Sequence, residues 1–238
     1  MTQKTTLYVV RHGNTFGPDD VVTRVGGRTD LPLVESGLNQ GTKLGEYFKQ
    51  QNIAPDMIFT SSLQRTIQTA AQAQKAMGTN IPTEIASTFN EIDYGIDENQ
   101  PEEIVRARLG DQAIEDWDQY CIVPDGWLVD VDGLRQAWRD FGTRVATEFS
   151  GKTVVIVTHN GVARFVSELL DGGSLGDDPA ENVKLKTGAF GRFEHDGASW
   201  RCAEWNTRPE KLLQSELSAS AAKNDGSKDG VKPKNMSF

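Results

Sequence analysis

The chain of 238 residues lacks long apolar runs. No stretch approaches the roughly 20 apolar residues that a membrane-spanning helix requires. The few apolar-leaning residues before Arg11 are too few for a secretion signal. We therefore expect a protein without a membrane span that is not secreted, and we place it in the cytoplasm.

Cysteine is scarce, and so are the patterns that bind metals or nucleotides. Cys121 and Cys202 are too few for a disulfide framework, and neither lies in a Cys-x-x-Cys pair or beside a histidine. We expect both to be buried as small apolar groups. There is no His-Glu-x-x-His pair, carboxylate cluster at ligand spacing or Gly-x-x-x-x-Gly-Lys-Ser/Thr loop. The sequence therefore predicts no metal site and no cofactor.

Positive charge is in deficit, with 25 Lys and Arg against 34 Asp and Glu and a net charge of −9. Nucleic acids are bound mainly through clustered Lys and Arg, so this balance argues against a nucleic-acid partner and favours a small substrate. A local cationic pocket remains compatible with an acidic exterior. Several arginines lie in or next to turn-like segments and could line it: Arg11, Arg24, Arg28, Arg65 and Arg164.

Short β-branched runs at 6–10 and 153–158 are typical of central strands covered on both faces. A third run at 57–60 precedes Ser61-Ser62, which we interpret as the hydroxyl N-cap of a helix over 63–77. Apolar spacing of three and four residues predicts further helices around 44–48, 134–149 and 162–170. This alternation indicates a three-layer α/β/α sandwich with a mostly parallel central sheet.

The rest of the chain divides into a cover, a hairpin and a tail. The irregular segment at about 92–133 is expected to pack over one end of the sheet, where open α/β sheets bind ligands. An Asp-Gly turn at 196–197 predicts a terminal β-hairpin that carries His195 on the surface and offers an edge for a homodimer. We expect one domain over 1–208, followed by a polar, flexible tail over 209–238.

Two of the three histidines, His12 and His159, follow directly after predicted central strands. Parallel neighbouring strands would bring both to the same sheet edge. Each is followed by glycine within two residues and accompanied by an arginine. Glycine lets backbone N–H groups approach an anion closely, and arginine offers donors that match phosphate oxygens. These residues fit a site for phosphate.

Five segments in order resemble the histidine phosphatase superfamily, also called phosphoglycerate mutase-like. They are Arg-His-Gly-Asn-Thr at 11–15, the stretch at 26–38, Ser-Ser-Leu-Gln-Arg-Thr-Ile-Gln-Thr-Ala at 61–70, Asn-Glu-Ile-Asp-Tyr-Gly at 90–95 and Thr-His-Asn-Gly at 158–161. The resemblance implies the phosphoglycerate mutase-like fold. It covers most of residues 5–170, whereas a bare Arg-His-Gly tripeptide would be a weak signal.

The resemblance also implies roles for the matching residues. His12 would attack phosphorus through its neutral imidazole and form a phosphohistidine. Arg11, Arg65 and a protonated His159 would stabilise the charge of the transferring phosphoryl group. Glu91 would protonate the leaving oxygen and then activate the incoming water or alcohol. A pKa raised by the neighbouring phosphate would suit Glu91 to the acid role.

A second group of residues is predicted to bind substrate: Asn14, Thr15, Gly27, Arg28 and Asn160. Asn14 and Thr15 either donate to phosphate oxygens or hold the loop. Arg24 and Arg28 either bind a second acidic group of the substrate or form surface ion pairs. We interpret Arg164 as bracing an acidic neighbour.

Within the family, the resemblance favours a phosphomonoester hydrolase, a histidine acid phosphatase-type enzyme that needs no metal. Glycolytic mutases carry Glu-Arg-x-Tyr-Gly after the family glutamate, whereas this chain has Glu-Ile-Asp-Tyr-Gly at 91–95. The expected substrate is a small phosphorylated metabolite or, alternatively, a phosphoprotein. The alternatives are a phosphoglycerate mutase-type phosphoryl transfer and an inactive binding or regulatory module. The presence of all five core residues argues against the inactive module.

Overall fold

The computed structural model describes residues 4–171, 175 and 183–215. Its centre is a six-stranded sheet with the order β3-β2-β4-β1-β5-β6. The strands are β1 (Thr5–Arg11), β2 (Met57–Thr60), β3 (Thr83–Ile85), β4 (Thr153–Thr158), β5 (Phe190–His195) and β6 (Trp200–Thr207). Strands β1 to β4 pair with one another in parallel. Strands β5 and β6 form an antiparallel hairpin, and β5 pairs antiparallel with β1. The predicted α/β fold with a mostly parallel sheet is confirmed.

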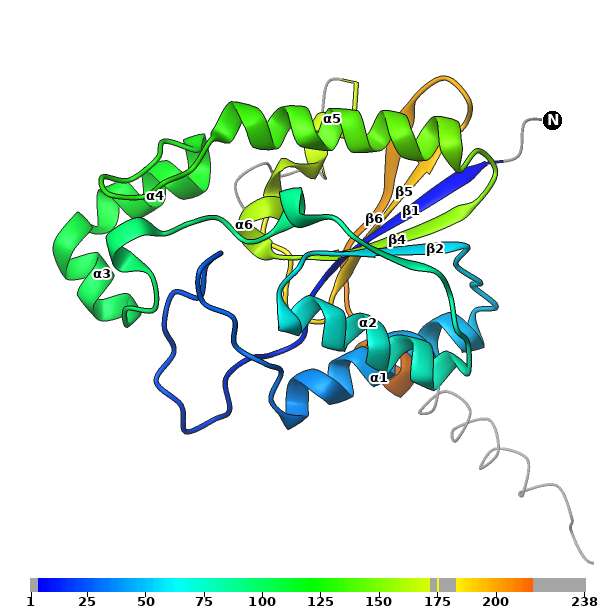
Figure 1. Ribbon diagram of the computed structural model, residues 1–238, viewed down its shortest axis with the longest axis horizontal. Helices are drawn as coiled ribbons and strands as arrows, with labels where there is room; N and C mark the ends of the chain where they lie inside the picture. Colours follow the sequence, from blue (N-terminus) through cyan, green and yellow to red (C-terminus); the bar gives the residue numbers. More distant parts are fainter. Residues whose placement is uncertain (1–3, 172–174, 176–182, 216–238) are drawn as a thin grey trace, which may run out of the picture.

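Helices cover both faces of this sheet (Figure 1). α1 (Glu35–Gln50) and α2 (Gln64–Met77) lie on one face. On the other lie α5 (Val131–Glu148), the short α6 (Asn160–Ala163) and the 3₁₀ helix η3 (Arg164–Leu169). Alternate side chains of the central strands enter the two cores because successive strand residues point to opposite faces.

The register of β1 against β4 places the two strand ends side by side. Arg11 pairs with Thr158, so the residues that follow, His12 and His159, leave the sheet at the same edge. The backbone N–H of His12 donates to Thr158 O at 3.0 Å, which continues the pairing by one residue. His195 pairs with Thr5 at the opposite end of β1, remote from this edge as predicted.

The segment predicted as a cover contains η2 (Gly95–Asp97), α3 (Glu102–Leu109) and α4 (Asp111–Tyr120). It lies beyond the carboxyl ends of the parallel strands (Figure 1). The buried carboxylate of Asp97 anchors it by accepting from Arg108 Nε at 2.8 Å and from Trp127 Nε1 at 2.7 Å. Charged hydrogen bonds of this kind hold an irregular segment in one position over the sheet edge.

Three local predictions are wrong. The helix after β2 has no hydroxyl cap: its first residue Gln64 donates its N–H to Asp30 Oδ1 at 2.7 Å. Ser61 instead turns its hydroxyl into the interior. The predicted helix over 162–170 consists of α6 followed by 3₁₀ turns. Cys121 and Cys202 are half-buried, and Cys121 has a left-handed backbone at the end of α4.

The sequence analysis also did not predict two short elements, β3 and the 3₁₀ turn η1 (Ser87–Phe89). Each has only three residues, which is too short for a periodic signal. In the predicted flexible tail, residues 209–215 are helical, and residues 216–238 lie outside the described part of the chain.

Within the described ranges, no helix combines the length and the apolar character that crossing a bilayer requires.

Trp138 in α5 is fully buried and should contribute strongly to stability. Its indole Nε1 donates to Val162 O at 2.8 Å, and its ring contacts Phe89 and Phe141. Trp138→Ala should lower the free energy of unfolding by about 3–5 kcal/mol, measured by urea titration. Arg135→Ala in the same helix, at a partly exposed side chain, should stay within about 0.5 kcal/mol of the native protein. Equal effects of the two substitutions would contradict the packing described here.

Candidate active site

The loop after β1 is held tightly at the sheet edge. The backbone N–H of Gly188 donates to both Arg11 O and His12 O, at 3.1 and 3.2 Å. A Cβ on Gly13 would lie 2.4 Å from Gly37 O at the start of α1, so only glycine fits there. The Arg-His-Gly turn is therefore fixed between α1 and the segment that precedes β5.

His12 is oriented by a backbone carbonyl. Its Nδ1 lies 2.7 Å from Gly13 O, and a carbonyl oxygen can only accept, so Nδ1 carries the hydrogen. The lone pair of a neutral ring is then on Nε2. Burial lowers the pKa of His12 well below its ordinary value, and the charges of Arg11 and Arg65 lower it further. His12 is buried, with 7% of its surface exposed, and its neutral form is the one that a nucleophile requires.

His159 belongs to a buried chain of hydrogen bonds. Arg65 Nε donates to its Nδ1 at 3.2 Å, and its Nε2 lies 2.9 Å from Ser61 Oγ. Since Nδ1 accepts, Nε2 carries the hydrogen, and Ser61 Oγ can donate onward to Thr66 Oγ1 at 2.8 Å. The His159 and His12 rings lie 5.0 Å apart between centroids.

Burial and the neighbouring charges favour the neutral form of His159. Burial lowers its pKa well below the ordinary value, and the charges of His12, Arg65 and Arg11 add to the effect. A protonated His159 beside a bound phosphoryl group stays a prediction, because the negative charge of that group would raise the pKa of the ring. The tautomer depends on Ser61, whose role the sequence did not indicate because its hydroxyl was interpreted as a helix cap.

Arg65 and Arg11 bring positive charge to the two rings. Arg65 is buried, and its Nη1 and Nη2 donate to Thr29 O and Gly26 O at 2.7 and 3.1 Å. Arg11 Nη1 donates to Leu185 O at 2.8 Å, whereas its buried Nε has no partner among the described residues. That N–H can donate to an anion.

Glu91 is buried against the start of α6. Its Oε1 accepts from the Ile92 N–H at 3.0 Å, and its Oε2 accepts from the Gly161 N–H at 3.2 Å. Burial raises the pKa of Glu91, although these hydrogen bonds and the charges of Arg65 and Arg11 oppose the rise. A carboxyl group with a raised pKa can donate a proton closer to neutral pH.

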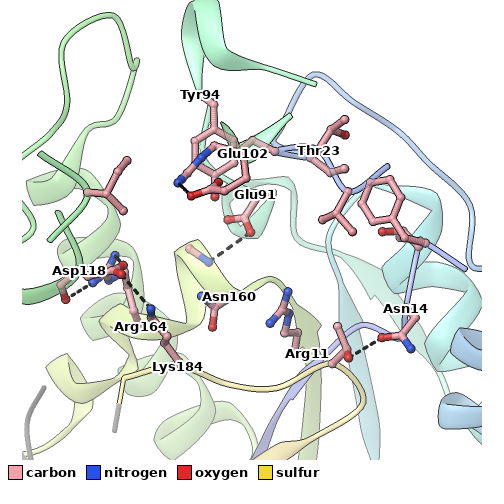
Figure 2. A pocket seen from close by; sticks show the side chains of 18 of the residues that line it. Arg11, Asn14, Thr23, Glu91, Tyr94, Glu102, Asp118, Asn160, Arg164 and Lys184 are labelled. Atoms are coloured by element: carbon pink, nitrogen blue, oxygen red, sulfur yellow. Dashed lines mark hydrogen bonds and ion pairs between the residues drawn. The ribbon is translucent and has the colours of Figure 1, made fainter. Parts of the chain in front are cut away.

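A cavity of about 570 Å³ opens above this group of residues (Figure 2). Arg11, Glu91 and Asn160 lie in its lining, and the predicted cover contributes Trp117 and Asp118 of α4. His12, Arg65 and His159 lie behind the lining in the interior. The structure thus brings the five predicted catalytic residues together beside one cavity.

The predicted substrate-binding residues divide into two groups. Asn14, Thr15 and Asn160 line the cavity. Asn14 Oδ1 accepts from Thr187 Oγ1 at 2.6 Å, and Asn160 Oδ1 accepts from the Leu185 N–H at 2.9 Å, so both also hold the surrounding loops.

Gly27 and Arg28 are not in the cavity lining. The Gly27 N–H donates to Ile92 O at 2.9 Å, and Arg28 pairs with Asp93 and donates to Gly95 O. Both residues join their loop to the segment that carries Glu91. For Arg28, the ion-pair interpretation is the one that the geometry bears out.

Arg24 and Arg164 both line the cavity and both have acidic neighbours. Arg24 pairs with Glu102 at 2.9 Å and lies over the rings of Tyr94 and Trp127. Arg164 Nη2 donates to the backbone oxygen of Asp118 at 2.6 Å, and its Nη1 lies 3.9 Å from Asp118 Oδ1, so the predicted acidic neighbour is present at a longer distance. Lys184 also forms an ion pair with Asp118, and no sequence pattern indicated this residue.

Among the described residues, no three His, Cys, Asp or Glu side chains are grouped so that they could hold a metal ion.

Gly161 sets how closely α6 approaches the carboxyl group of Glu91. A Cβ at this position would lie 2.4 Å from Glu91 Oε1, so Gly161→Ala must displace the carboxyl group. We expect kcat for an alkyl phosphate to fall by about 10²-fold, the lower end of what a general acid contributes. In a Glu91→Gln background the same substitution should have little further effect, because the two act through one group. Unchanged kcat in Gly161→Ala would contradict this account.

The model of a family described as the histidine phosphatase superfamily, branch 1, matches residues 7–208. A 2,3-bisphosphoglycerate-dependent phosphoglycerate mutase of Clavibacter sepedonicus is 28% identical over 224 residues, covering 82% of this chain and 88% of the mutase. The corresponding mutase of Mycobacterium leprae is 27% identical over 218 residues, covering 80% of this chain and 86% of that mutase.

Solved structures share the fold. A mycobacterial glucosyl-3-phosphoglycerate phosphatase superposes with a TM-score of 0.69 at 21% identity, covering 86% of this chain and 99% of the phosphatase. Bacillus stearothermophilus YhfR gives a TM-score of 0.69 at 24% identity, covering 85% and 96%.

Proposed function

The chain belongs to the histidine phosphatase superfamily, branch 1, and from this membership we propose that it is a phosphomonoester hydrolase that forms a phosphohistidine on His12. The observation that carries the proposal is the contact of His12 Nδ1 with Gly13 O beside Arg11 and Glu91. It presents a neutral imidazole whose Nε2 lone pair is free for attack.

In the first step, Nε2 of His12 attacks phosphorus as the bond from phosphorus to the leaving oxygen breaks. Glu91 gives its proton to that oxygen, so the product leaves as an alcohol. Arg11 and Arg65 stabilise the charge on the transferring phosphoryl group. Splitting the displacement into two steps lowers the barrier of each.

In the second step, the Glu91 carboxylate takes a proton from water as the water oxygen attacks phosphorus. The N–P bond breaks, and inorganic phosphate is released with His12 neutral again. Glu91 regains its proton in this step, so the cycle closes without another acid. His159 positions Arg65 by accepting from its Nε.

Hydrolysis is favoured over mutase chemistry by the environment of Ile92. This residue stands where glycolytic mutases carry the arginine that follows the family glutamate. Its side chain is only 5% exposed and packs in the apolar core, so it offers no charge to a phosphoglycerate. We therefore propose that water, and not a second substrate, accepts the phosphoryl group from His12.

Mutase-type transfer is the second candidate, because the curated relatives compared above are mutases. The two are separated by incubating the protein with 3-phosphoglycerate and 2,3-bisphosphoglycerate. Phosphate release that outpaces formation of 2-phosphoglycerate supports the hydrolase. The reverse order of rates would replace it with the mutase.

The substrate proposed is a small phosphorylated metabolite, since the cavity of about 570 Å³ has the size of small-molecule sites. A phosphate-release screen over metabolite phosphomonoesters and phosphoproteins, run with EDTA, tests the substrate class. It also tests the proposal that Arg11 and Arg65 supply the positive charge without a metal. Lack of release from every compound, while the folded protein binds phosphate, would favour the inactive binding module.

A further inference from the structure

One wall of the cavity carries a cationic group that the proposed phosphoryl chemistry does not use. It consists of Arg164, Lys184 and Asp118, here called the Asp118 cluster. Lys184 Nζ lies 2.8 Å from Asp118 Oδ2, and Arg164 Nη1 lies 3.9 Å from Asp118 Oδ1. Figure 2 shows these side chains converging on the side of the pocket away from Asn14.

The Asp118 cluster has an excess of positive charge. It holds two cations and one carboxylate, so within the described part of the chain it carries a net charge of about +1. A second cationic wall of the cavity contains Arg24 and Arg106. Both pair with Glu102, and Arg106 also pairs with Asp111. That wall has two carboxylates for two cations and is balanced.

Arg164 is fixed as a binding group rather than as a solvated surface charge. Its side chain is 6% exposed, and its guanidinium lies over the Trp117 ring at 4.6 Å. Its Nη2 donates to Asp118 O at 2.6 Å, so the position of the charge is set by α4. Lys184, with a side chain 60% exposed, can move to meet a ligand from the opposite side.

The Asp118 cluster is joined to the phosphoryl site through one peptide segment. Leu185 O accepts from Arg11 Nη1 at 2.8 Å, and the Leu185 N–H donates to Asn160 Oδ1 at 2.9 Å. Lys184 is the residue directly before Leu185, about 3.8 Å away along the chain. Arg11 and Lys184 also line the same cavity, so one substrate bound there can contact both cations.

We propose that the Asp118 cluster is a second anion subsite that binds a carboxylate on the leaving-group side of the substrate. The preferred substrates are phosphomonoesters of small hydroxy acids. A carboxylate carries one negative charge and matches the single excess positive charge of the cluster, whereas a second phosphate monoester carries nearly two. Arg164 offers the planar donors that suit a carboxylate.

This inference rests on the proposed hydrolase activity, and the test separates the two. Phosphate release is measured for 3-phosphoglycerate and for glycerol 3-phosphate, which replaces the carboxylate by a hydroxymethyl group. The native enzyme should show a kcat/KM at least about 10-fold higher for 3-phosphoglycerate, the effect of one charged hydrogen bond. Lys184→Met should reduce that ratio by about 10-fold, mainly through KM.

The control is Lys186→Met, which removes the same charge two residues away and should retain the native ratio. Arg164→Lys keeps the charge but not the planar donors, and it should also lower the ratio. A ratio unaffected by Lys184→Met would overturn the subsite while leaving the hydrolase standing. Failure of the native enzyme to release phosphate from either compound and from p-nitrophenyl phosphate would instead refute the hydrolase.

A second phosphate as the bound anion is a separate outcome. It is tested by comparing fructose 1,6-bisphosphate with fructose 6-phosphate in the native and Lys184→Met enzymes. A Lys184-dependent preference for the bisphosphate that exceeds the preference for 3-phosphoglycerate would overturn the assignment to a carboxylate.

Discussion

Replacing His12 by alanine is expected to lower kcat for phosphomonoester hydrolysis by about 10⁴-fold or more, because it removes the group that accepts the phosphoryl group. The remaining residues, Arg11, Arg65 and Glu91, would still bind phosphate and polarise it. Binding without a nucleophile does not open the two-step route. Initial rates with p-nitrophenyl phosphate, together with fluorescence-monitored phosphate binding, separate loss of chemistry from loss of binding.

The matched control for this variant is His195→Ala. His195 is a histidine of the same chain at the far end of β1, with its ring beside Trp200. Its removal should leave kcat unchanged. Rapid quenching of the native enzyme in alkaline detergent should also trap an acid-labile, alkali-stable phosphoryl group on His12. Persistent turnover in His12→Ala would exclude the phosphohistidine route, whatever the trapping experiment gives.

Replacing Glu91 by glutamine should lower kcat by about 10²–10⁴-fold for alkyl phosphates, because the leaving alkoxide then departs without a proton. The first step should suffer far less with p-nitrophenyl phosphate, whose leaving group is stable as an anion. Glutamine keeps the shape, and its single amide oxygen can still accept from one of the two N–H groups, that of Ile92 or that of Gly161. The variant therefore tests the proton and leaves the packing in place.

The pH profile gives the same test without a substitution. Burial raises the pKa of Glu91, and the proton is needed in the first step. Hydrolysis of an alkyl phosphate should therefore decline as the pH rises through that raised pKa. On the acid side, His12 must stay unprotonated, and its lowered pKa keeps it so to well below the usual histidine range.

In Glu91→Gln the alkaline decline should disappear, whereas the exposed Glu103→Gln of α3 should retain the native profile. If Glu91→Gln lost as much activity on p-nitrophenyl phosphate as on alkyl phosphates and kept the alkaline decline, Glu91 would not be the general acid. The pH dependence would then have to come from another group beside the cavity.

Much of the site was predictable because its signals are local in the chain. Two β-branched runs that each end in a histidine predict two central strands, and parallel pairing then brings His12 and His159 together. The family resemblance added Arg11, Arg65 and Glu91, which the fold places beside the same cavity. Length, periodicity and motif spacing are properties of contiguous segments, so they can be recognised in the sequence without knowledge of the packing.

The roles of Ser61, Arg28 and Lys184 were decided only by the tertiary structure. A serine before a helix has the same local pattern whether it caps the helix or accepts from a histidine 98 residues away, and here it meets His159. Arg28 looks equally suited to substrate and to an ion pair until Asp93 is placed beside it. Lys184 lies in no motif, and it reaches the cavity because Leu185 bonds to Arg11 and Asn160.

His12 shows the same division between sequence and tertiary structure. The sequence determined that this histidine follows a central strand and carries the family motif. The fold decided which of its nitrogens holds the hydrogen, through the carbonyl of Gly13, and which charges lower its pKa. Protonation and orientation depend on distances of a few ångströms between segments far apart in the chain, and only the packed structure sets those distances.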